Sequence, residues 1–596
     1  MHGQERDPEQ AHIESPHGAQ ARSSCFWLSA TVLLCGLGLG ILMGFTSGAV
    51  PRADEWNTPG DFLLARTTGT ATFAHLFRQH NESRVIFAQL LAGFISDLWG
   101  WNQHIFHALN WALLLSTALL FLRLLRRTGL FERAPSWPVV LVLCVATALI
   151  FTPVQWRNLL YSGQIITLCI PFLLVAGLSV HLAQHLPVWL RYGCAGVFAL
   201  LASFSYVNGL MLWFLLWPAP AVMLSNRTLR LRRAEIVASA VFFACAFLVI
   251  GAFFHDYHKP PGHPALTFGL LAPHRVLVFA STLLAGPIFP ERTDLWFLEG
   301  KRGLFFLCGG LAGLAGLLAG AYLLRERRTM WTRDFLARVF PFAILMAYSG
   351  LSAVAIASAR AGFGLSGNVS RYSTIAVPAF LGLAGLVATI ELGRPARAAP
   401  RTLRAFAVVL AVAMTVAAGV GIFDCISDKQ AARQAELSLA FRGVCPGDPM
   451  LTHVHPMPEH ILATVAGLEK AGLLPSLPSY EWVVTSVPSP RPEMSYELHA
   501  GEVAGKRFIR GRITPSSGID EDDILLLWDR EQDRPASAFL APAGMNYPGM
   551  GEGAFEVRLA MAAMPDIDLG KLELRLARPK SHEVWRLPSR TPGFEK

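Results

Sequence analysis

The sequence has few charged residues, and its longest apolar stretches contain none. Asp, Glu, Lys and Arg together make up 16% of the 596 residues, whereas 53% are hydrophobic. Soluble domains contain about 25% charged residues, so this composition excludes an ordinary soluble enzyme and indicates a polytopic membrane protein. The apolar stretches also lack the intramembrane carboxylates that proton- or ion-coupled transporters usually use as relays. Their absence disfavours a coupled transporter.

The sequence also lacks the alternation of aromatic and basic residues that is typical of nucleic-acid channels. Its formal net charge is +9, but its arginines concentrate in short connections between apolar stretches. Four arginines fall in each of the segments 123–133, 225–233, 325–333 and 394–404. Such clusters are typical of the cytoplasmic loops of membrane proteins. We therefore expect no nucleic-acid partner.

Eleven apolar stretches approach the roughly 20 residues that a helix needs to cross a bilayer. They are 26–48, 104–122, 137–154, 159–182, 192–206, 209–224, 234–254, 303–324, 336–357, 372–391 and 404–423. With residues 1–25 as a cytoplasmic tail, about eleven spans place all four arginine clusters in the cytoplasm. Two further stretches, 85–99 and 275–290, are then expected to be interfacial or re-entrant helices on the outer side. The neighbours 192–206 and 209–224 have an alternative interpretation as one long tilted helix.

Residues 424–596 differ in character from the preceding part, with more Pro, Asp and Glu. The span count places them outside the cytoplasm. The segment 456–475 has the periodicity of an amphipathic helix, and the stretches 554–560 and 571–577 alternate with the period of a strand. We expect a mainly α membrane domain, 26–423, followed by an extracytoplasmic α+β domain that resembles a small β-sandwich.

Few cysteines lie outside the predicted spans. Seven of the nine fall inside them or, for Cys25, directly at the edge of the first, where Cys usually acts as a small apolar residue, and only Cys425 and Cys445 lie apart from them. The topology places both in a potentially oxidising compartment, and the segment between them has helical character. We expect a disulfide between them, with two separate thiols as the alternative. His453 and His455 lack further ligands at zinc-finger spacing, which disfavours a metal there.

The first outer loop, 49–103, is the richest in groups that can do chemistry. It begins with Asp54 and Glu55, directly after the first predicted span, and continues with Asp61 and the segment "RQHNESR" at 78–84. A carboxylate beside a membrane-embedded cavity can accept a proton from a hydroxyl or hold a divalent metal ion. The alternative for this acidic pair is a solvated loop or a helix cap just before Trp56.

Four segments carry a resemblance to a known class of proteins: "RQHNESRVIFAQLL", "TPVQWRNLLYSGQ", "SFSYVNGLMLWFLLWP" and "SRYSTIAVP". Together with an outer acidic pair after the first span and an outer C-terminal domain, they resemble blocks of bacterial membrane proteins similar to the GT-C glycosyltransferases. The resemblance implies a multi-pass protein of the bacterial inner membrane. It also implies that Asp54 and Glu55 are the catalytic or metal-binding carboxylates.

In an outward-facing enzyme that resembles this class, the sugar donor is expected to be a lipid-linked sugar of the polyprenyl-phosphate type. Its tail would lie between spans, among membrane lipids, and the acceptor would be an extracytoplasmic glycan, lipid or protein. Cations stabilise a leaving phosphate, and amides bind sugar hydroxyls. The expected contacts with substrate are Asp61, His80, Asn81, Glu82, Arg84, Arg157, Asn158, Gln164 and Arg371.

No cofactor is assigned by the sequence, although the resemblance allows a divalent metal ion held by Asp54, Glu55 or Glu82. For Arg371 the alternative is snorkelling to the membrane interface, and for Asn158 and Gln164 it is hydrogen bonding between helices. Two other functions stay open. One is a transporter or flippase of a lipid-linked glycan, and the other is a non-catalytic envelope protein whose outer domain binds glycan.

Overall fold

The structure is a computed structural model of the chain. The residues that it describes are 16–129, 135–183, 185–225, 231–264, 268–290, 332–363, 367–392, 401–445, 451, 454–455, 457–474, 477–503, 506–514, 519–520, 522–540, 554–557 and 571–589. They form two compact units. Unit 1 contains residues 1–45, 76–90 and 106–425, and unit 2 contains residues 46–75, 91–105 and 426–596.

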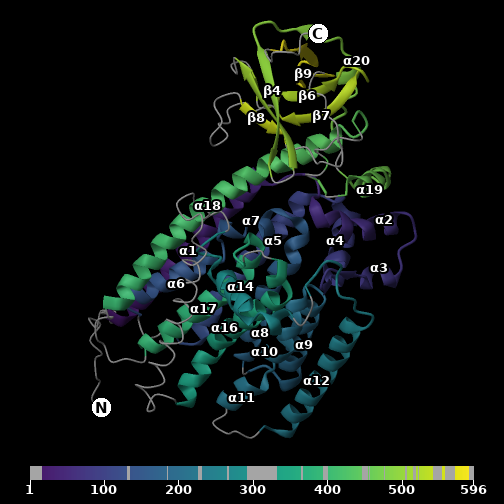
Figure 1. Cartoon of the computed structure of the whole chain (residues 1–596). Coiled ribbons are helices and arrows are strands. Elements are labelled where there is room, and N and C mark those ends of the chain that lie inside the picture. Colours follow the sequence, from purple (N-terminus) through teal and green to yellow (C-terminus); the bar gives the residue numbers. More distant parts are fainter. Residues whose placement is uncertain are drawn as a thin grey trace, which may run out of the picture. The chain divides into compact units, whose positions relative to one another are not determined.

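The described residues are mostly helical, and nine stretches among them are long and apolar enough to cross a membrane (Figure 1). These stretches are Ser23–Thr46, Gln103–Arg127, Trp137–Leu160, Ser162–His181, Val207–Leu224, Arg233–Phe254, Arg333–Phe363, Ser370–Glu391 and Leu403–Ala440. They correspond to nine of the eleven predicted spans. Of the other two, 192–206 belongs to a shorter helix, and 303–324 lies outside the described residues.

The principal helices of unit 1 follow from these apolar runs. They are α1 (Pro16–Thr46), α5 (Gln103–Arg127), α6 (Trp137–Leu149), α8 (Ile165–His181), α9 (Val188–Ser203), α12 (Arg233–Phe254), α14 (Pro273–Ala285), α16 (Arg333–Arg360), α17 (Ser370–Leu392) and α18 (Arg401–Ala440). Short elements join them: η3 (Pro153–Gln155), α7 (Trp156–Leu160), η4 (Ser162–Gln164), η5 (Val207–Met211), α10 (Leu212–Leu215), α11 (Ala219–Ser225), α13 (Phe268–Leu271) and η7 (Ala361–Phe363). The helix α18 belongs to unit 1 up to Cys425 and to unit 2 beyond it.

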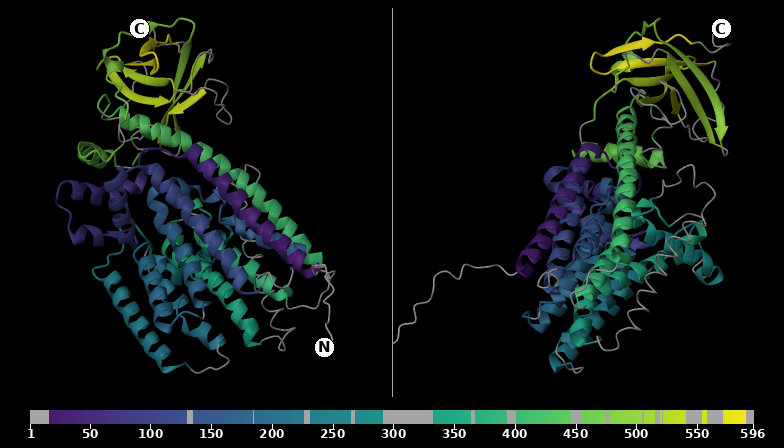
Figure 2. Two further views of the ribbon diagram at one scale, coloured as in Figure 1. Left: turned by 180° about the vertical axis from the view of Figure 1, so that it is seen from behind. Right: turned by 90° about the vertical axis from the view of Figure 1, so that its left-hand side faces the viewer.

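Small residues bring the helices of unit 1 into close contact. The indole N–H of Trp111 on α5 donates to the carbonyl oxygen of Gly36 on α1 at 2.8 Å. At Gly385 on α17, an added Cβ would overlap the ring of Phe342 on α16. Without a hydrophobic driving force between helices in lipid, such close approach supplies much of the packing energy. Figure 2 shows these helices from two further sides.

The helix α9 lies beside α12 and runs in the same direction (Figure 1). Near the N-termini of both helices, Tyr192 Oη and Ser239 Oγ are 2.9 Å apart. Past the C-terminus of α9, the ring of Phe204 packs against Phe253 near the end of α12. The chain turns after Ser203 and starts a new segment at η5, so the alternative of one long helix across 192–224 is wrong.

Two apolar helices are too short to cross a bilayer directly. One is α4 (Ile86–Trp99), with 14 residues, and the other is α14, with 13. At 1.5 Å per residue they are about 20 Å long, whereas the hydrocarbon layer is about 30 Å thick. Their lengths agree with the expectation that 85–99 and 275–290 are interfacial or re-entrant.

Unit 2 combines the start of the first outer loop with the C-terminal part of the chain. The loop forms η1 (Ala53–Glu55), η2 (Trp56–Gly60) and α2 (Asp61–Thr67), and α3 (Phe73–Phe77) follows them. The predicted amphipathic helix is α19 (Pro458–Lys470), and its apolar side chains Ile461, Val465 and Leu468 are fully buried. The helix α19 packs against α2, where a Cβ at Gly467 would overlap Leu64.

The last part of unit 2 is built from two β-sheets. One has five strands in the order β3-β10-β9-β6-β7, and the other has three in the order β4-β5-β8. All pairings are antiparallel except that of β10 with β3. The strands are β3 (Ser489–Pro490), β4 (Ser495–Val503), β5 (Lys506–Thr514), β6 (Ile524–Asp529), β7 (Arg534–Leu540), β8 (Ala554–Val557), β9 (Leu572–Arg578) and β10 (Glu583–Arg586). A short helix, α20 (Trp482–Thr485), precedes them.

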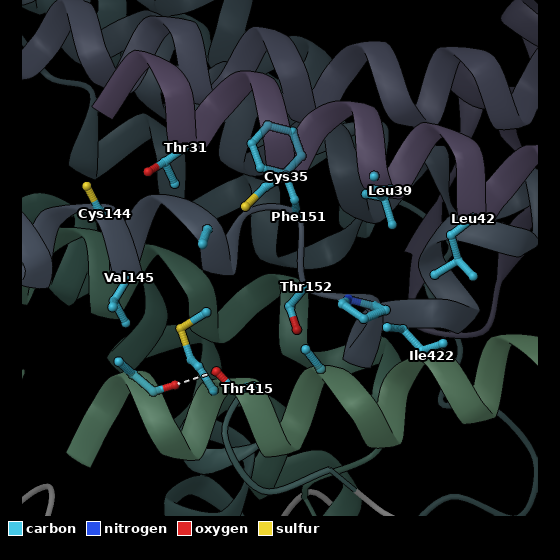
Figure 3. Close-up of a pocket in the computed structure, with 16 residues that line it drawn as sticks. Thr31, Cys35, Leu39, Leu42, Cys144, Val145, Phe151, Thr152, Thr415 and Ile422 are labelled. Carbon is cyan, nitrogen blue, oxygen red and sulfur yellow. Dashed lines mark hydrogen bonds between the residues drawn. The ribbon is translucent and has the colours of Figure 1, made fainter. Parts of the chain in front are cut away.

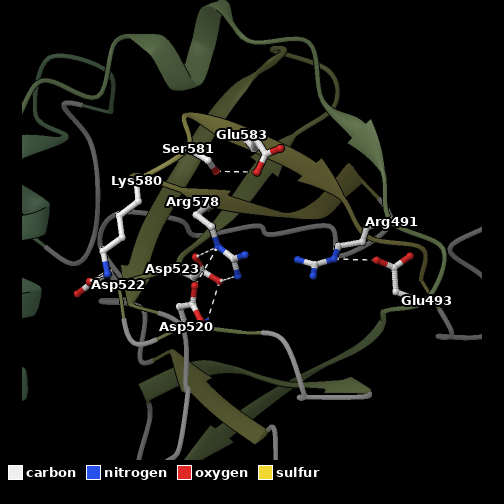
Figure 4. Close-up of polar contacts among 9 residues, drawn as sticks. All are labelled: Arg491, Glu493, Asp520, Asp522, Asp523, Arg578, Lys580, Ser581 and Glu583. Carbon is white, nitrogen blue, oxygen red and sulfur yellow. Dashed lines mark hydrogen bonds and ion pairs between the residues drawn. The ribbon is translucent and has the colours of Figure 1, made fainter.

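The two sheets share one apolar core, which includes Leu498 and Ile513 from the smaller sheet and Leu525 and Leu574 from the larger. The sequence therefore identified β8 and β9 correctly, but it missed the hairpin of β4 and β5. At one edge of the core, Asp523 is fully buried and accepts hydrogen bonds from Arg578 at 2.8 and 2.7 Å (Figure 4).

The predicted disulfide between Cys425 and Cys445 is not formed, and both residues are thiols in the structure. Cys425 lies inside α18, which continues to Ala440. Fifteen residues of helix rise about 22 Å, whereas the Cα atoms of a disulfide lie about 4.4–6.8 Å apart. Beyond the helix, the backbone N–H of Cys445 donates to the carbonyl oxygen of Phe441 at 2.7 Å. The chain at this point makes a further turn instead of an extended return.

Candidate functional site

The two carboxylates predicted to be catalytic lie in unit 2 and have different surroundings. Glu55 is buried, and its Oε2 accepts a hydrogen bond from the backbone N–H of Arg52 at 2.7 Å. This bond caps η1, because it satisfies an N–H that has no partner within the helix. Asp54 is exposed. Of the acidic pair, Glu55 therefore has the capping role that the sequence left open, and Asp54 is accessible.

Two histidines of unit 2 contact the same loop. Oδ1 of Asp61 lies 3.2 Å from Nε2 of His460, and Nδ2 of Asn57 lies 3.1 Å from Nε2 of the buried His455. Within the described ranges, no three His, Cys, Asp or Glu side chains converge as a metal-binding group. The divalent ion that the resemblance allows at Asp54, Glu55 or Glu82 stays a prediction, and the reaction proposed below uses none.

In unit 1, the segment 79–84 forms a tight hairpin of β1 (Gln79–His80) and β2 (Ser83–Arg84). Asn81 at its turn has a φ of 49°, and its Nδ2 lies 3.3 Å from Nε2 of His80. Arg84 is buried and donates to the carbonyl oxygens of Phe253, Phe77 and His255. Burial lowers the pKa of Arg84. Because it makes three backbone contacts, we assign it to the framework and not to substrate binding.

Glu82, at the hairpin turn, is the centre of a charged cluster in unit 1. One carboxylate oxygen accepts a hydrogen bond from Arg360 at 2.6 Å, and the other lies 2.9 Å from Nδ1 of His263. All three side chains are mostly buried, with exposed fractions of 16% for Glu82, 18% for Arg360 and 13% for His263. The carboxylate is therefore held by a guanidinium on one side and an imidazole on the other.

The phenol of Tyr206 lies in the same region, between α9 and η5. Burial raises the pKa of Tyr206 to about 12, so the phenol is protonated at neutral pH and can donate a hydrogen bond. Tyr372, Arg371, Arg360 and Glu82 are all close enough to act on it electrostatically. The two predicted residues Arg371 and Glu82 therefore both lie within electrostatic range of the same phenol.

The segment before α8 is bonded to the start of α17. Nδ2 of Asn158 donates to the carbonyl oxygen of Arg371 at 2.8 Å and to Oγ1 of Thr374 at 2.7 Å. Gln155 accepts from the same Thr374 hydroxyl at 2.6 Å. Asn158 therefore joins helices, as in the alternative stated for it, and Gln164 accepts from a neighbour on its own helix, Thr167, at 3.1 Å.

Two arginines flank this junction without a carboxylate partner among the described residues. The backbone N–H of Arg157 donates to Oγ of Ser370 at 3.2 Å, which places it beside Arg371 in the chain fold. Each guanidinium lies over the ring of its neighbour, Arg157 over Trp156 at 5.0 Å and Arg371 over Tyr372 at 5.2 Å. In addition, the buried Nε of Arg371 has no hydrogen-bond acceptor within the described ranges. These two cations are therefore available to an anion.

Three members of the cluster were not predicted from the sequence: Arg360, His263 and Tyr206. Arg360 follows an apolar stretch by only a few residues and has the pattern of an interfacial anchor. His263 is one of several histidines in the connection after α12, and nothing in the local sequence distinguishes it. The contacts of Arg360 and His263 with Glu82 each span more than 170 residues of sequence, so no local pattern could have found these two residues.

An apolar groove lies between α1, α6 and α18 in unit 1, with a volume of about 530 Å³ (Figure 3). Its lining is almost entirely apolar and includes Leu39, Val145 and Ile422. Thr152 and Pro153 line it as well, and they begin the segment that carries Arg157. The groove and the arginine therefore share one short piece of chain.

The chain was compared with models of protein families, with curated proteins and with solved structures, and no match was found in any of the three. The function is therefore inferred from the residues and their geometry.

Proposed function

We propose that the chain is a membrane glycosyltransferase that resembles the GT-C class. It moves a sugar from a polyprenyl-phosphate donor to a glycan, lipid or protein outside the cytoplasm. The observation that carries this proposal is the pair of arginines, Arg157 and Arg371. They flank one junction of unit 1 and have no carboxylate partner among the described residues.

Arginines without a carboxylate partner suit a phosphate better than a neutral ligand. A guanidinium can bind two phosphate oxygens at once, and such charge-assisted bonds are about twice as strong as neutral ones. In the proposed transfer, the donor's phosphate gains charge as the bond to the sugar breaks, and Arg157 and Arg371 stabilise that charge. The protonated phenol of Tyr206 can donate a further hydrogen bond in the same region.

The apolar groove of unit 1 supports a lipid as the carrier of this phosphate. Its apolar lining suits an isoprenoid chain, and it ends at Thr152 and Pro153, a few residues before Arg157. We therefore propose that the tail of the donor binds between α1, α6 and α18. Membrane lipids would fill the groove when the donor is absent.

Two contacts support the proposed topology, in which about eleven spans leave the C-terminal domain outside the cytoplasm. Within unit 2, Arg52 follows α1 and pairs with Asp428 on α18 at 2.7 Å, so the first and last spans exit on the same side. Such an arrangement requires an odd number of crossings. Within unit 1, α9 runs parallel to α12, so we count α9 as a crossing although it has only 16 residues.

We propose that Asp54 contacts the acceptor. The resemblance assigns the first-loop carboxylates to the reaction, and Asp54 is the exposed one of the two. Glu55 is assigned to the cap of η1. We propose the bacterial inner membrane as the location, as the resemblance implies.

The proposal is tested with purified protein in lipid nanodiscs. Undecaprenyl phosphate is expected to bind, and Arg371→Ala or Arg157→Ala is expected to weaken that binding about ten- to a hundredfold, since hydrogen bonds to charged groups contribute about 1.5–3 kcal/mol. Arg275→Ala is the matched control, because Arg275 is an exposed arginine of the same unit.

A panel of polyprenyl-phosphate monosaccharides then tests transfer. Release of polyprenyl phosphate together with a glycosylated acceptor would support the enzyme. Binding without release, but with movement of the lipid between leaflets, would support the flippase instead. No binding of any polyprenyl phosphate by the wild-type protein would contradict the proposal.

A further inference from the structure

Glu82 and His263 form a close ion-pair contact. Oε1 of Glu82 lies 2.9 Å from Nδ1 of His263, and the second carboxylate oxygen accepts from Arg360. The contact does not have hydrogen-bond geometry, because Oε1 has no hydrogen-bond donor among the described residues. The carboxylate therefore acts on the imidazole through its charge, which stabilises the imidazolium that forms when the ring takes up a proton.

Further contacts hold the imidazole in place. The ring of His263 packs edge-on against Phe363, with 5.1 Å between ring centroids. Its carbonyl oxygen accepts a hydrogen bond from Nζ of Lys259 at 2.7 Å. Within the described ranges Nε2 has no hydrogen-bond partner, and 13% of the side chain is exposed. The ring is therefore packed against Phe363 and accessible at Nε2.

A carboxylate beside a histidine that takes a proton from a hydroxyl stabilises the imidazolium that forms. In this chain Glu82 has that position, and Arg360 fixes Glu82 in turn. Tyr206, Tyr257 and Arg360 all lie within electrostatic range of Glu82, and Arg371 lies within electrostatic range of Tyr206.

We infer that His263, beside the carboxylate of Glu82, accepts the proton of the acceptor hydroxyl; this inference rests on the proposed function. Nε2 of His263 takes the proton while the hydroxyl oxygen forms a bond to C1 of the sugar. The bond between C1 and the phosphate oxygen breaks, and its electron pair leaves with the polyprenyl phosphate, beside Arg371. The imidazolium then releases the proton to water. Glu82 is a positioning residue, because it acts through His263.

The chain contains a matched control for this pair. His258 lies five residues before His263, and its Nε2 is 3.6 Å from Oδ1 of Asp256. Both of these side chains are more than 80% exposed. Both histidines lie in the same loop, each beside a carboxylate, but only the pair of Glu82 and His263 is enclosed and bonded to an arginine.

The test uses the full-length protein in nanodiscs, with a polyprenyl-phosphate sugar that the wild type turns over. His263→Ala is expected to lower kcat by about 10²–10⁴-fold, the usual effect of losing a general base. Its affinity for undecaprenyl phosphate should stay within about threefold of wild type. Added imidazole should restore part of kcat, which a merely structural histidine would not allow. His258→Ala should turn over as fast as the wild type, with or without imidazole.

Glu82→Gln provides a second variant that retains the shape of the side chain. It should lower kcat by about 10–100-fold and leave the KM for the donor unchanged. His263→Gln, which can still donate to Glu82, serves in place of His263→Ala if the latter does not fold. Two results would overturn the inference. One is full kcat in His263→Gln. The other is a loss of kcat in His263→Ala that imidazole does not restore, together with full activity in Glu82→Gln. Failure of the proposed function would show in the wild type itself, as absence of transfer.

Discussion

Arg52 donates two hydrogen bonds to Asp428, at 3.1 and 2.7 Å, and both side chains are about 95% buried. The pair joins the segment that leaves the first membrane span to the part of α18 that lies beyond the last predicted span. A buried ion pair contributes little net stability compared with an apolar pair, but removing one partner leaves an isolated buried charge.

Asp428→Ala is therefore expected to destabilise unit 2 by about 3–5 kcal/mol, the usual cost of breaking a buried pair. The measurement is protection of the C-terminal domain from a protease in membranes. Asp97→Ala is the matched control, because the pair of Arg66 and Asp97 lies in the same unit with side chains 36% and 57% exposed. Such exposed pairs contribute about 0–1 kcal/mol. Equal sensitivity of the two variants would contradict the assigned role of Arg52 and Asp428.

Reporter fusions test the topology. Fusions at positions 130, 230, 328 and 398 are expected to report the cytoplasm, because the arginine clusters lie there. A fusion at position 430 is expected to report the outer compartment. The fusion at 230 tests directly whether α9 crosses the membrane, since its reporter would lie outside the cytoplasm if α9 is not a crossing. A cytoplasmic signal from 430 would contradict an odd number of spans.

Asp54 and Glu55 are expected to respond differently to isosteric substitution. If His263 accepts the proton, Asp54→Asn should raise the KM for the acceptor severalfold and leave kcat close to that of wild type. Glu55→Gln should have little effect on either, because a Gln oxygen can still accept the N–H of Arg52. Steady-state kinetics on both variants measure kcat and the KM for the acceptor. If Asp54→Asn instead slowed turnover about a hundredfold or more, as loss of a general base does, the role of base would return to Asp54.

Cys425 and Cys445 are expected to be recovered as two separately alkylated thiols, even from protein made in an oxidising envelope. The physical reason is the 15 residues of α18 that separate Cys425 from the end of the helix. Non-reducing peptide mapping makes the measurement. A peptide pair joined through these cysteines would mean that the last turns of α18 unwind in the membrane.

The spans were predictable because the length of an apolar run is a local property of the sequence. The helical character of residues 424–440 was predicted as well, but not that they continue the last span without a break, since charges such as Asp424, Lys429 and Glu436 mark the membrane boundary but do not stop a helix. Similarly, the β4–β5 hairpin contains many charged residues, such as Lys506 and Arg510, which obscure its alternation.

For the candidate site, the sequence predicted the identity of some residues but not their arrangement. Glu82, Arg157 and Arg371 were identified from the sequence, and in the structure both Glu82 and Arg371 lie within electrostatic range of Tyr206. The role of Arg84 was not, because it depends on backbone partners that the sequence does not reveal, whereas the capping role of Glu55 was one of the alternatives stated for the acidic pair. The carbonyl oxygen that Arg84 contacts at Phe253 is 169 residues away.

The contacts of Arg84 have a consequence for how the first outer loop is built. They tie the hairpin at 79–84 to unit 1, whereas residues 46–75 belong to unit 2. The loop therefore alternates between the units, because residues 91–105 return to unit 2 after the segment 76–90 of unit 1. An exchange of outer domains between related proteins would have to cut at both ends of that segment, after residue 105 and in α18. The N-terminal part of the loop would then travel with the C-terminal domain, although more than 350 residues separate them in the sequence.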